Sequence, residues 1–357
     1  TLWHTLSLHD ALPICNNNVA STRTEITYDG YAPKPAITAK TEDGAGVSIT
    51  SGSSLLSFND QPIRVYVDFG ELVDNFVVMV EDVVLGNATA TSGIQNDGNG
   101  KYHFTINPTE IAPNTTVTID IEANVASDMA GNWNRKANQF NFTYDGIAPA
   151  AEISVQTATP ETLISGGNVN GTEQPLTATV KFGEPVYGFI ESDLVLNNAN
   201  ATLTSGTDGD SEFVFTLTPS SDGQVTLDVY ADVATDLAGN NNTAATQFEF
   251  DYDGTKPTPT LNGSLVVNGN GSRTNDNPII VQILFDEVVT GFDNAQTDIQ
   301  VTNGVATNLS GAGTTYTVEI IPDADGLVSV TVPADVCVDD PHGNLNNAAA
   351  TAFEITY

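Results

Sequence analysis

The sequence of 357 residues predicts an all-β fold built from tandem β-sandwich domains. Three observations predict it: landmarks that recur in a fixed order, apolar residues at every second position, and Gly, Asn, Asp and Pro at short intervals between the apolar segments. Each copy closes on an aromatic segment, and the closing residues are Tyr28, Tyr144, Tyr252 and Tyr357. Their spacings of 116, 108 and 105 residues are those of a domain rather than of a short solenoid repeat.

The N-terminal 14 residues are interpreted as a non-native sequencing-adapter artefact. One reading frame of a widely used short-read adapter encodes residues 5–14, TLSLHDALPI. Residues 15–30 align without gaps on residues 239–254, which places Cys15 where the repeat has Gly239. An adapter base in place of the first base of a Gly codon would produce this Cys. The alternative is a real amphipathic N-terminus that ends in a free thiol.

Three complete copies follow a truncated one. We expect residues 15–30 to be the C-terminal remnant of a truncated repeat, followed by domains at 31–146, 147–254 and 255–357. Pro33, Pro149 and Pro257 each stand three residues behind a Tyr-Asp-Gly exit and open the next first strand. The chain is therefore expected to be a fragment that tells nothing about its native ends.

Within a copy, strict alternation places one face of each strand in a core. Ile63, Val65 and Val67 alternate with polar residues, and the same pattern recurs at residues 117–121, 225–229 and 328–332. About seven short antiparallel strands per copy, each with one wet face, indicate immunoglobulin-like sandwiches arranged end to end. Aromatic residues are expected to anchor the cores: Phe69, Phe104, Phe142, Phe182, Phe215 and Phe250.

The charge balance is strongly acidic, with 45 Asp and Glu against 10 Lys and Arg and a formal net charge of −35. Such a surface repels nucleic acid and anionic membranes and attracts cations. The sequence contains no run of 18 apolar residues, so no segment of it is expected to span a bilayer. Cys337 aligns with Ala126 and Ala234, which predicts a small buried residue rather than a nucleophile. His103 and His342 lie in different copies, which argues against a zinc site or a His-based catalytic centre.

Three acids are expected to meet where each linker enters a domain. In the predicted topology, the end of the second strand and a later Asp-x-Ala-Gly-Asn loop both lie beside the incoming linker. The linker gives an Asp, the strand end a Glu and the loop a second Asp. We name these the first acid set (Asp29, Glu71, Asp128), the second acid set (Asp145, Glu184, Asp236) and the third acid set (Asp253, Glu287, Asp339).

Clustered carboxylates repel one another, and a hard divalent cation relieves that repulsion, so the acid sets predict structural Ca²⁺ sites. Asn132, Asn240 and Asn344, or backbone carbonyls, could complete the coordination shell. The alternative is that each Asp caps its own turn, as Asp in tight loops commonly does. Calcium ions at three sites would balance only a small part of the net negative charge. The remaining acidic residues are explained either by solubility or by adaptation to a salty medium.

The motifs resemble a known family. Residues 182–189 (FGEPVYGF), Ser192-Asp193-Leu194 and the loop at 235–240 (TDLAGN) are similar to the bacterial Ig-like domains repeated in large surface adhesins and biofilm-associated proteins. The resemblance covers residues 15–357 and implies a secreted, extracellular or cell-surface stalk whose joints are stiffened by calcium in several relatives. The third copy departs from the pattern, because its loop has an extra residue and Asp286 replaces a Gly.

Function is expected to be structural: a stalk segment of an extracellular bacterial adhesin, with neighbouring Ig-like repeats of the same chain as its partners. A spacer or accessory module of a secreted polysaccharide-degrading enzyme is the alternative, which only flanking sequence would separate. A third reading gives one copy ligand binding, with Trp133 stacking on a sugar; a receptor or glycan at a distal domain is unidentified. No nucleophile, base and orienting partner recur together, so an enzyme is not expected.

Overall fold

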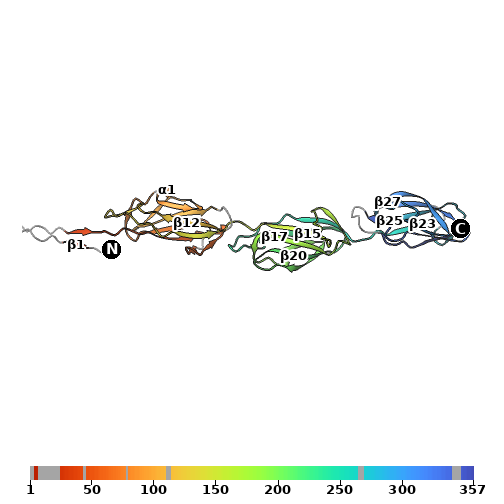
Figure 1. The fold of residues 1–357 in the computed structure, drawn as a ribbon, viewed down its shortest axis with the longest axis horizontal. Helices are drawn as coiled ribbons and strands as arrows, with labels where there is room; N and C mark the ends of the chain where they lie inside the picture. Colours follow the sequence, from red (N-terminus) through yellow and green to blue (C-terminus); the bar gives the residue numbers. More distant parts are fainter. Residues whose placement is uncertain are drawn as a thin grey trace, which may run out of the picture. The chain divides into compact units, whose positions relative to one another are not determined.

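The computed structural model describes residues 4–6, 25–42, 46–77, 79–109, 114–263, 269–339 and 347–357. The chain divides into two compact units, one of Thr1–Pro149 with Thr235–Asn241 and one of Ala150–Ala234 with Asn242–Tyr357. Strands dominate both units, and a single short α-helix and two 3-10 turns are found among the described residues. The prediction of an all-β fold is confirmed (Figure 1).

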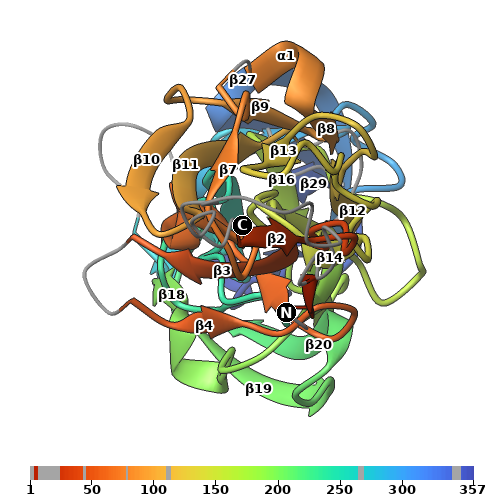
Figure 2. The ribbon, with the colours of Figure 1, turned by 90° about the vertical axis from the view of Figure 1, so that its left-hand side faces the viewer.

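The first unit contains the first complete repeat. One sheet has the order β10-β11-β6-β3-β4, with β9 also paired to β11, and the facing sheet has the order β5-β14-β12-β8. A separate two-stranded ladder joins β13 to β7. Figure 2 shows α1 beside β8, with which it is in contact. The elements are β3 (Ala36–Thr41), β4 (Ser48–Ile49), β5 (Leu55–Leu56), η1 (Phe58–Asp60), β6 (Ile63–Asp68), β7 (Val73–Asp74), α1 (Met79–Asp82), β8 (Val83–Gly86), β9 (Ala88–Ala90), β10 (Gln95–Gly98), β11 (Lys101–Pro108), β12 (Thr115–Ile121), β13 (Ser127–Asp128) and β14 (Phe140–Tyr144).

The second repeat has two four-stranded sheets, with the orders β15-β17-β20-β19 and β16-β22-β21-β18. The two central strands of the first sheet, β17 and β20, pair from Leu176 opposite Leu217 to Lys181 opposite Glu212. The elements are β15 (Ala151–Gln156), β16 (Gly167–Asn170), β17 (Leu176–Val186), η2 (Glu191–Asp193), β18 (Leu194–Asn197), β19 (Ala199–Ser205), β20 (Asp210–Pro219), β21 (Gly223–Val229) and β22 (Phe248–Asp253).

The third repeat follows the same plan, with the orders β23-β25-β27 and β24-β30-β28-β26. The short strand β29 pairs with the far end of β25. The elements are β23 (Pro259–Gly263), β24 (Ser272–Arg273), β25 (Ile279–Thr290), β26 (Gln300–Thr302), β27 (Gly304–Pro322), β28 (Leu327–Thr331), β29 (Val338–Asp339) and β30 (Phe353–Thr356).

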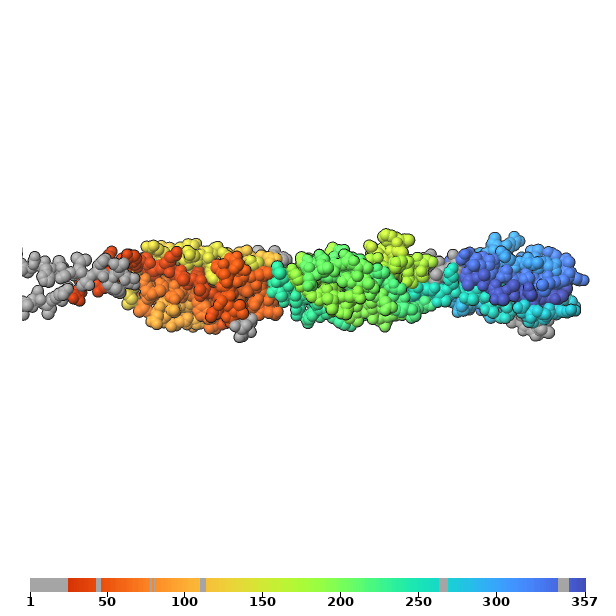
Figure 3. All heavy atoms as spheres, turned by 90° about the horizontal axis from the view of Figure 1, so that it is seen from below, coloured from red at the N-terminus to blue at the C-terminus, as the bar shows by residue number. Residues whose placement is uncertain are grey.

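Each repeat buries its own core between its two sheets, and in the space-filling view each repeat is a closely packed body of atoms (Figure 3). The alternation predicted from the sequence is confirmed, because the inward residues of all four predicted sets, within 63–67, 117–121, 225–229 and 328–332, lie at 0–1% exposure. A cluster of three aromatic rings in edge-to-face contact recurs in every core. The clusters are Phe69, Phe76 and Tyr102; Phe182, Phe189 and Phe213; and Phe285, Phe292 and Tyr316.

The strand pairing differs from the prediction in one respect. The predicted sandwiches were wholly antiparallel, whereas each repeat contains one parallel pair: β5 with β14, β16 with β22 and β24 with β30. In every repeat the chain passes early from the first sheet to the second, where a short strand pairs with the closing strand of the repeat. This crossing could not be predicted from the sequence, because β5, β16 and β24 have only two to four residues, too few for a clear alternation pattern.

The N-terminal segment forms one ladder. β1 (His4–Leu6) pairs antiparallel with β2 (Ile26–Tyr28), with His4 opposite Tyr28. Three of the 14 residues assigned to an adapter therefore have strand geometry, and residues 7–24, with Cys15, lie outside the described residues. An isolated two-stranded pair is marginally stable in water, so the artefact interpretation remains a prediction.

Candidate metal centre at the head of each domain

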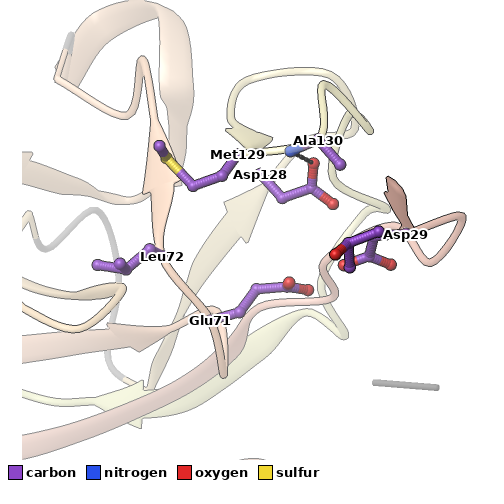
Figure 4. Close-up of a pocket in the computed structure, with 7 residues that line it drawn as sticks. Asp29, Glu71, Leu72, Asp128, Met129 and Ala130 are labelled. Atoms are coloured by element: carbon purple, nitrogen blue, oxygen red, sulfur yellow. Dashed lines mark hydrogen bonds between the residues drawn. The ribbon is translucent and has the colours of Figure 1, made fainter. Parts of the chain in front are cut away.

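The first acid set lies at a shallow cavity of about 410 Å³ in the first unit. Asp29 follows β2, Glu71 follows β6, and Asp128 ends β13. Each residue has a carboxylate oxygen within 4.8 Å of one on each of the other two. The carboxylates face the same space, which Leu72 and Met129 border on the other side (Figure 4). The three acids predicted to converge do so.

The loop after β13 fixes Asp128, whose side chain is buried at 5% exposure. Asp128 Oδ1 accepts hydrogen bonds from the backbone N–H of Ala130 and Asn132, both at 2.8 Å, and Oδ2 accepts one from Asn132 Nδ2 at 2.9 Å. Burial opposes ionisation, but the hydrogen bonds from Asn132, Ala130 and Gly131 prevail and lower the pKa of Asp128. Asp128 is therefore a fixed anion.

Glu71 is placed in a less favourable environment. Burial raises the pKa of Glu71, and the charges of Asp128 and Asp29 raise it further. Its backbone is held by the turn between β10 and β11. A Cβ on Gly100 would lie 1.7 Å from the carbonyl oxygen of Glu71, and Gly100 has φ +75°, so glycine is required there. The turn thus fixes the position of an acid whose charge is opposed by its surroundings.

The third acid set repeats this arrangement in the second unit. Asp253 ends β22, Glu287 lies within β25, and Asp339 ends β29. The same 4.8 Å limit holds for their carboxylate oxygens. The pKa of Glu287 is raised to about 7. Burial is the largest cause, and the negative charges of four aspartates raise it further: Asp253, Asp286, Asp339 and Asp222. Glu287 Oε1 is buried and accepts no hydrogen bond within the described part of the chain.

The predicted position of Glu at a strand end is wrong in two copies. β6 does end before Glu71, but β17 runs through Glu184 to Val186 and β25 runs through Glu287 to Thr290. The register shifts between Lys181 and Val186, and between Leu284 and Val289. The physical reason is a bulge, which keeps a strand paired while it re-aims a side chain.

The second acid set is divided between the two units. Asp145 and Asp236 belong to the first unit and are buried, whereas Glu184 belongs to the second. The assembly of this set stays a prediction, and the first and third acid sets carry the argument for the site.

The turn-capping alternative is also present. Asp29, Asp145 and Asp253 each accept a hydrogen bond from the backbone N–H two residues later, at 3.0, 3.2 and 2.9 Å. One oxygen of each linker Asp therefore caps its own turn, as Asp commonly does. Turn capping and cation binding are compatible, because a carboxylate has two oxygens and several lone pairs.

Two of the asparagines expected to complete the coordination shell present their donor end to the loop Asp. Asn132 and Asn240 each direct Nδ2, a donor, toward the carboxylate of the loop Asp, at 2.9 and 2.8 Å. A donor cannot coordinate a cation. Asn344 lies outside the described residues. Amide oxygens, backbone carbonyls and water remain candidates for the neutral ligands of a cation.

A second asparagine in each loop escaped the sequence reasoning. Asn134, Asn242 and Asn347 are at most 2% exposed. In each, Oδ1 accepts from two successive backbone N–H groups and Nδ2 donates to two carbonyls, as Asn134 does with Val125, Ala126, Glu122 and Arg135. The recurring second Asn in residues 131–134, GNWN, and 239–242, GNNN, was the available signal. This side chain fixes the start of the acid-bearing loop.

Two other predicted residues have the expected environments. Cys337 is 4% exposed and packs in the third core, as Ala126 and Ala234 do in theirs, which confirms a buried thiol. Burial raises the pKa of the Cys337 thiol to about 12. Trp133 is 50% exposed on its loop.

Among the described residues, no helix has the length and apolar character needed to cross a membrane.

Comparison with solved structures gives distant likenesses to multidomain proteins. Three titin domains, I67–I69, share 11% identity and a TM-score of 0.32, with 94% of this chain and 89% of that one covered. Invasin, a bacterial integrin-binding protein, shares 14% identity and a TM-score of 0.34, with 90% of this chain and 60% of that one covered. InvD of Yersinia pseudotuberculosis shares 12% identity and a TM-score of 0.35, with 85% of this chain and 96% of that one covered. These scores are too low to carry an argument about function.

The family comparison is more direct. No curated protein matches the sequence. A family model described as a bacterial Ig-like domain matches residues 43–144, 148–252 and 253–357. These three matches cover most of the chain and coincide with the repeated sandwiches, so the chain belongs to the family of bacterial Ig-like domains.

Proposed function

We propose that this chain is a structural stalk segment of an extracellular bacterial adhesin, and that calcium stiffens the linker at the head of each domain. The repetition of one sandwich, with the same acid set in the same place, supports the proposal. If one repeat bound a specific ligand, its loops would be expected to differ from those of the other repeats, so repetition of the same loops favours a structural role.

The donor set of the site fits a hard cation. Three carboxylates converge in the first and third acid sets, and neither set contains a nitrogen or sulfur ligand. Ca²⁺ prefers six to eight oxygen ligands, which three carboxylates, backbone carbonyls and water can supply. Burial, and after it like-charge repulsion, raises the pKa of Glu71 and Glu287, and a cation would remove that repulsion. When bound, it would join a linker residue to two residues of the following domain.

The single observation that carries the proposal is Glu287. Its Oε1 is buried without a hydrogen bond in the described chain, and its neighbours are acids. A buried, unsatisfied carboxylate oxygen costs stability unless a positive charge compensates it. A calcium ion bound at the third acid set provides that compensation.

The test is small-angle scattering and calorimetry of the chain in millimolar Ca²⁺ and then in chelator. Extracellular calcium modules bind at about 10⁻⁴ to 10⁻³ M, so micromolar calcium should not suffice. We expect chelator to shorten and broaden the distribution of maximum dimensions and to lower the melting temperature. The same profile in both conditions would reject the calcium sites. A parallel sample in Mg²⁺ controls for general charge screening.

A further inference from the structure

The loop Asp236–Asn240 comes from the second repeat, yet it groups with the residues of the first compact unit. Asn240, at its end, is 4% exposed. Its Nδ2 donates to the backbone carbonyl of Asp145 at 2.7 Å and to Asp236 Oδ2 at 2.8 Å, and its Oδ1 accepts from the backbone N–H of Phe58 at 3.1 Å. Phe58 begins η1 of the first repeat, and Asp145 follows its last strand.

Hydrogen bonds within the loop itself orient this amide. Asp236 Oδ1 accepts from the backbone N–H groups of Gly239 and Asn240, at 2.7 and 2.9 Å, which closes the loop on itself. Asp236 Oδ2 then fixes the orientation of the Asn240 amide. The bonds to Asp236, Asp145 and Phe58 together satisfy both donor hydrogens and the acceptor oxygen of Asn240, which a buried amide requires.

The first repeat has an equivalent contact. Asn132 Nδ2 donates to the backbone carbonyl of Asp29 at 3.0 Å and to Asp128 Oδ2 at 2.9 Å. Asp29 stands in the linker before the first repeat as Asp145 stands in the linker before the second. Two copies therefore use the same asparagine to hold the backbone of the incoming linker.

We propose that the Asp-x-Ala-Gly-Asn loop is a docking element whose partner is the backbone of the preceding repeat and its linker, and that it works without a metal ion. Asn240 recognises a peptide N–H and a peptide carbonyl, groups that every repeat offers whatever its side chains. The loop thus supplies a permanent hydrogen-bonded contact, to which calcium, as proposed above, would add a second and reversible one.

The test uses the full chain in chelator, so that no calcium site contributes. Residue-resolved amide hydrogen exchange should show Phe58 protected in the wild type, and Asn240→Ala should accelerate exchange at Phe58 by about tenfold or more. Proteolysis within residues 145–150 should be faster in the same variant. The matched control is Asn241→Ala, since Asn241 is the exposed neighbour, and it should behave as the wild type.

A second variant approaches the contact from the other side. Phe58→Pro removes the N–H that Asn240 accepts, and Ser57 has extended backbone (φ −98°, ψ 177°) that tolerates a following proline. It should also speed proteolysis of residues 145–150, and it decides the matter if Asn240→Ala unfolds the second repeat. An unprotected Phe58 amide in the wild type, or wild-type proteolysis in Phe58→Pro, would overturn the proposal. A chain that failed to respond to calcium would leave this test intact.

Discussion

The first and third acid sets contain the same three residue types, with carboxylate oxygens within the same 4.8 Å limit, but they differ in the charge around them. Glu71 is opposed by burial and by Asp128 and Asp29. Glu287 is opposed by burial and by four aspartates, including Asp286, which stands where the first repeat has Gly70. Identical ligands can therefore be held at different electrostatic cost, and the third acid set, which departs most from the repeat pattern, has the greater need for a cation.

The largest expected effect is on the calcium response. At a calcium concentration of about 100 times Kd, binding stabilises a folded domain by about 2.7 kcal/mol, which is several degrees in melting temperature. Glu287→Gln should remove more of the calcium-induced increase than Glu71→Gln, as measured by calorimetry with and without chelator. Asp208→Asn, an exposed acid outside all three acid sets, serves as the control. Equal losses in the two Gln variants would remove the distinction between the sets.

The next effect is on pH dependence in chelator. The folded pKa of Glu287 lies at about 7, above the usual value of 4.5, so the folded state binds this proton more tightly than the unfolded state. The stabilising contribution is fully present below about pH 4.5 and is lost as the pH rises through about 7. The difference in melting temperature between Glu287→Gln and the wild type should therefore grow from pH 5 to pH 8. The same difference for Glu71→Gln should grow less.

A smaller effect is expected from Asp286→Asn. The amide keeps an oxygen for the backbone N–H of Thr258, which donates to Asp286 Oδ1 at 2.6 Å, and removes one charge near Glu287. In chelator the variant should be more stable by up to about 1 kcal/mol, which is the range for partly exposed charge pairs. Chemical denaturation at low and high salt measures this. A loss of stability would mean that the surrounding charge is not what separates the two acid sets.

Cys337 offers a competing explanation for the difference, because only the third repeat has a thiol at this core position. Cys337→Ala trims one buried atom and should cost no more than about 1 kcal/mol. It should leave the calcium response unchanged. In a Cys15→Gly background, thiol labelling of the native protein should be slow, because the thiol is buried and its pKa is about 12. Rapid labelling would show that this core opens.

The smallest effect concerns the support of the first acid set. β1 pairs with β2, and Asp29 follows β2 directly. If residues 1–14 are an adapter artefact, deleting them should leave both melting temperature and calcium response unchanged within error. A cooperative loss of several degrees would show that β1 belongs to the folded protein and helps to position Asp29. Amplification of the locus from source DNA should recover a Gly codon at position 15.

Much of this arrangement could be predicted from the sequence, because alternation and recurrence report directly on strands and repeats. The inward faces and the convergence of the first and third acid sets follow from those two patterns. The bulges at Glu184 and Glu287 could not be predicted, since a bulge depends on pairing between distant strands. The donor role of Asn132 was also missed, because composition identifies an amide but not which of its ends faces a carboxylate.

The parallel pair in each repeat has a mechanical consequence. β5, β16 and β24 lie early in their repeats and pair in parallel with the closing strands β14, β22 and β30. When a chain is pulled by its two ends, the early part of a repeat is drawn one way and its last strand the other. Two parallel strands drawn in opposite directions slide along each other, so their hydrogen bonds bear the load together instead of opening one after another. In each repeat, a parallel strand pair that resists shear therefore joins the early part of the repeat to its closing strand.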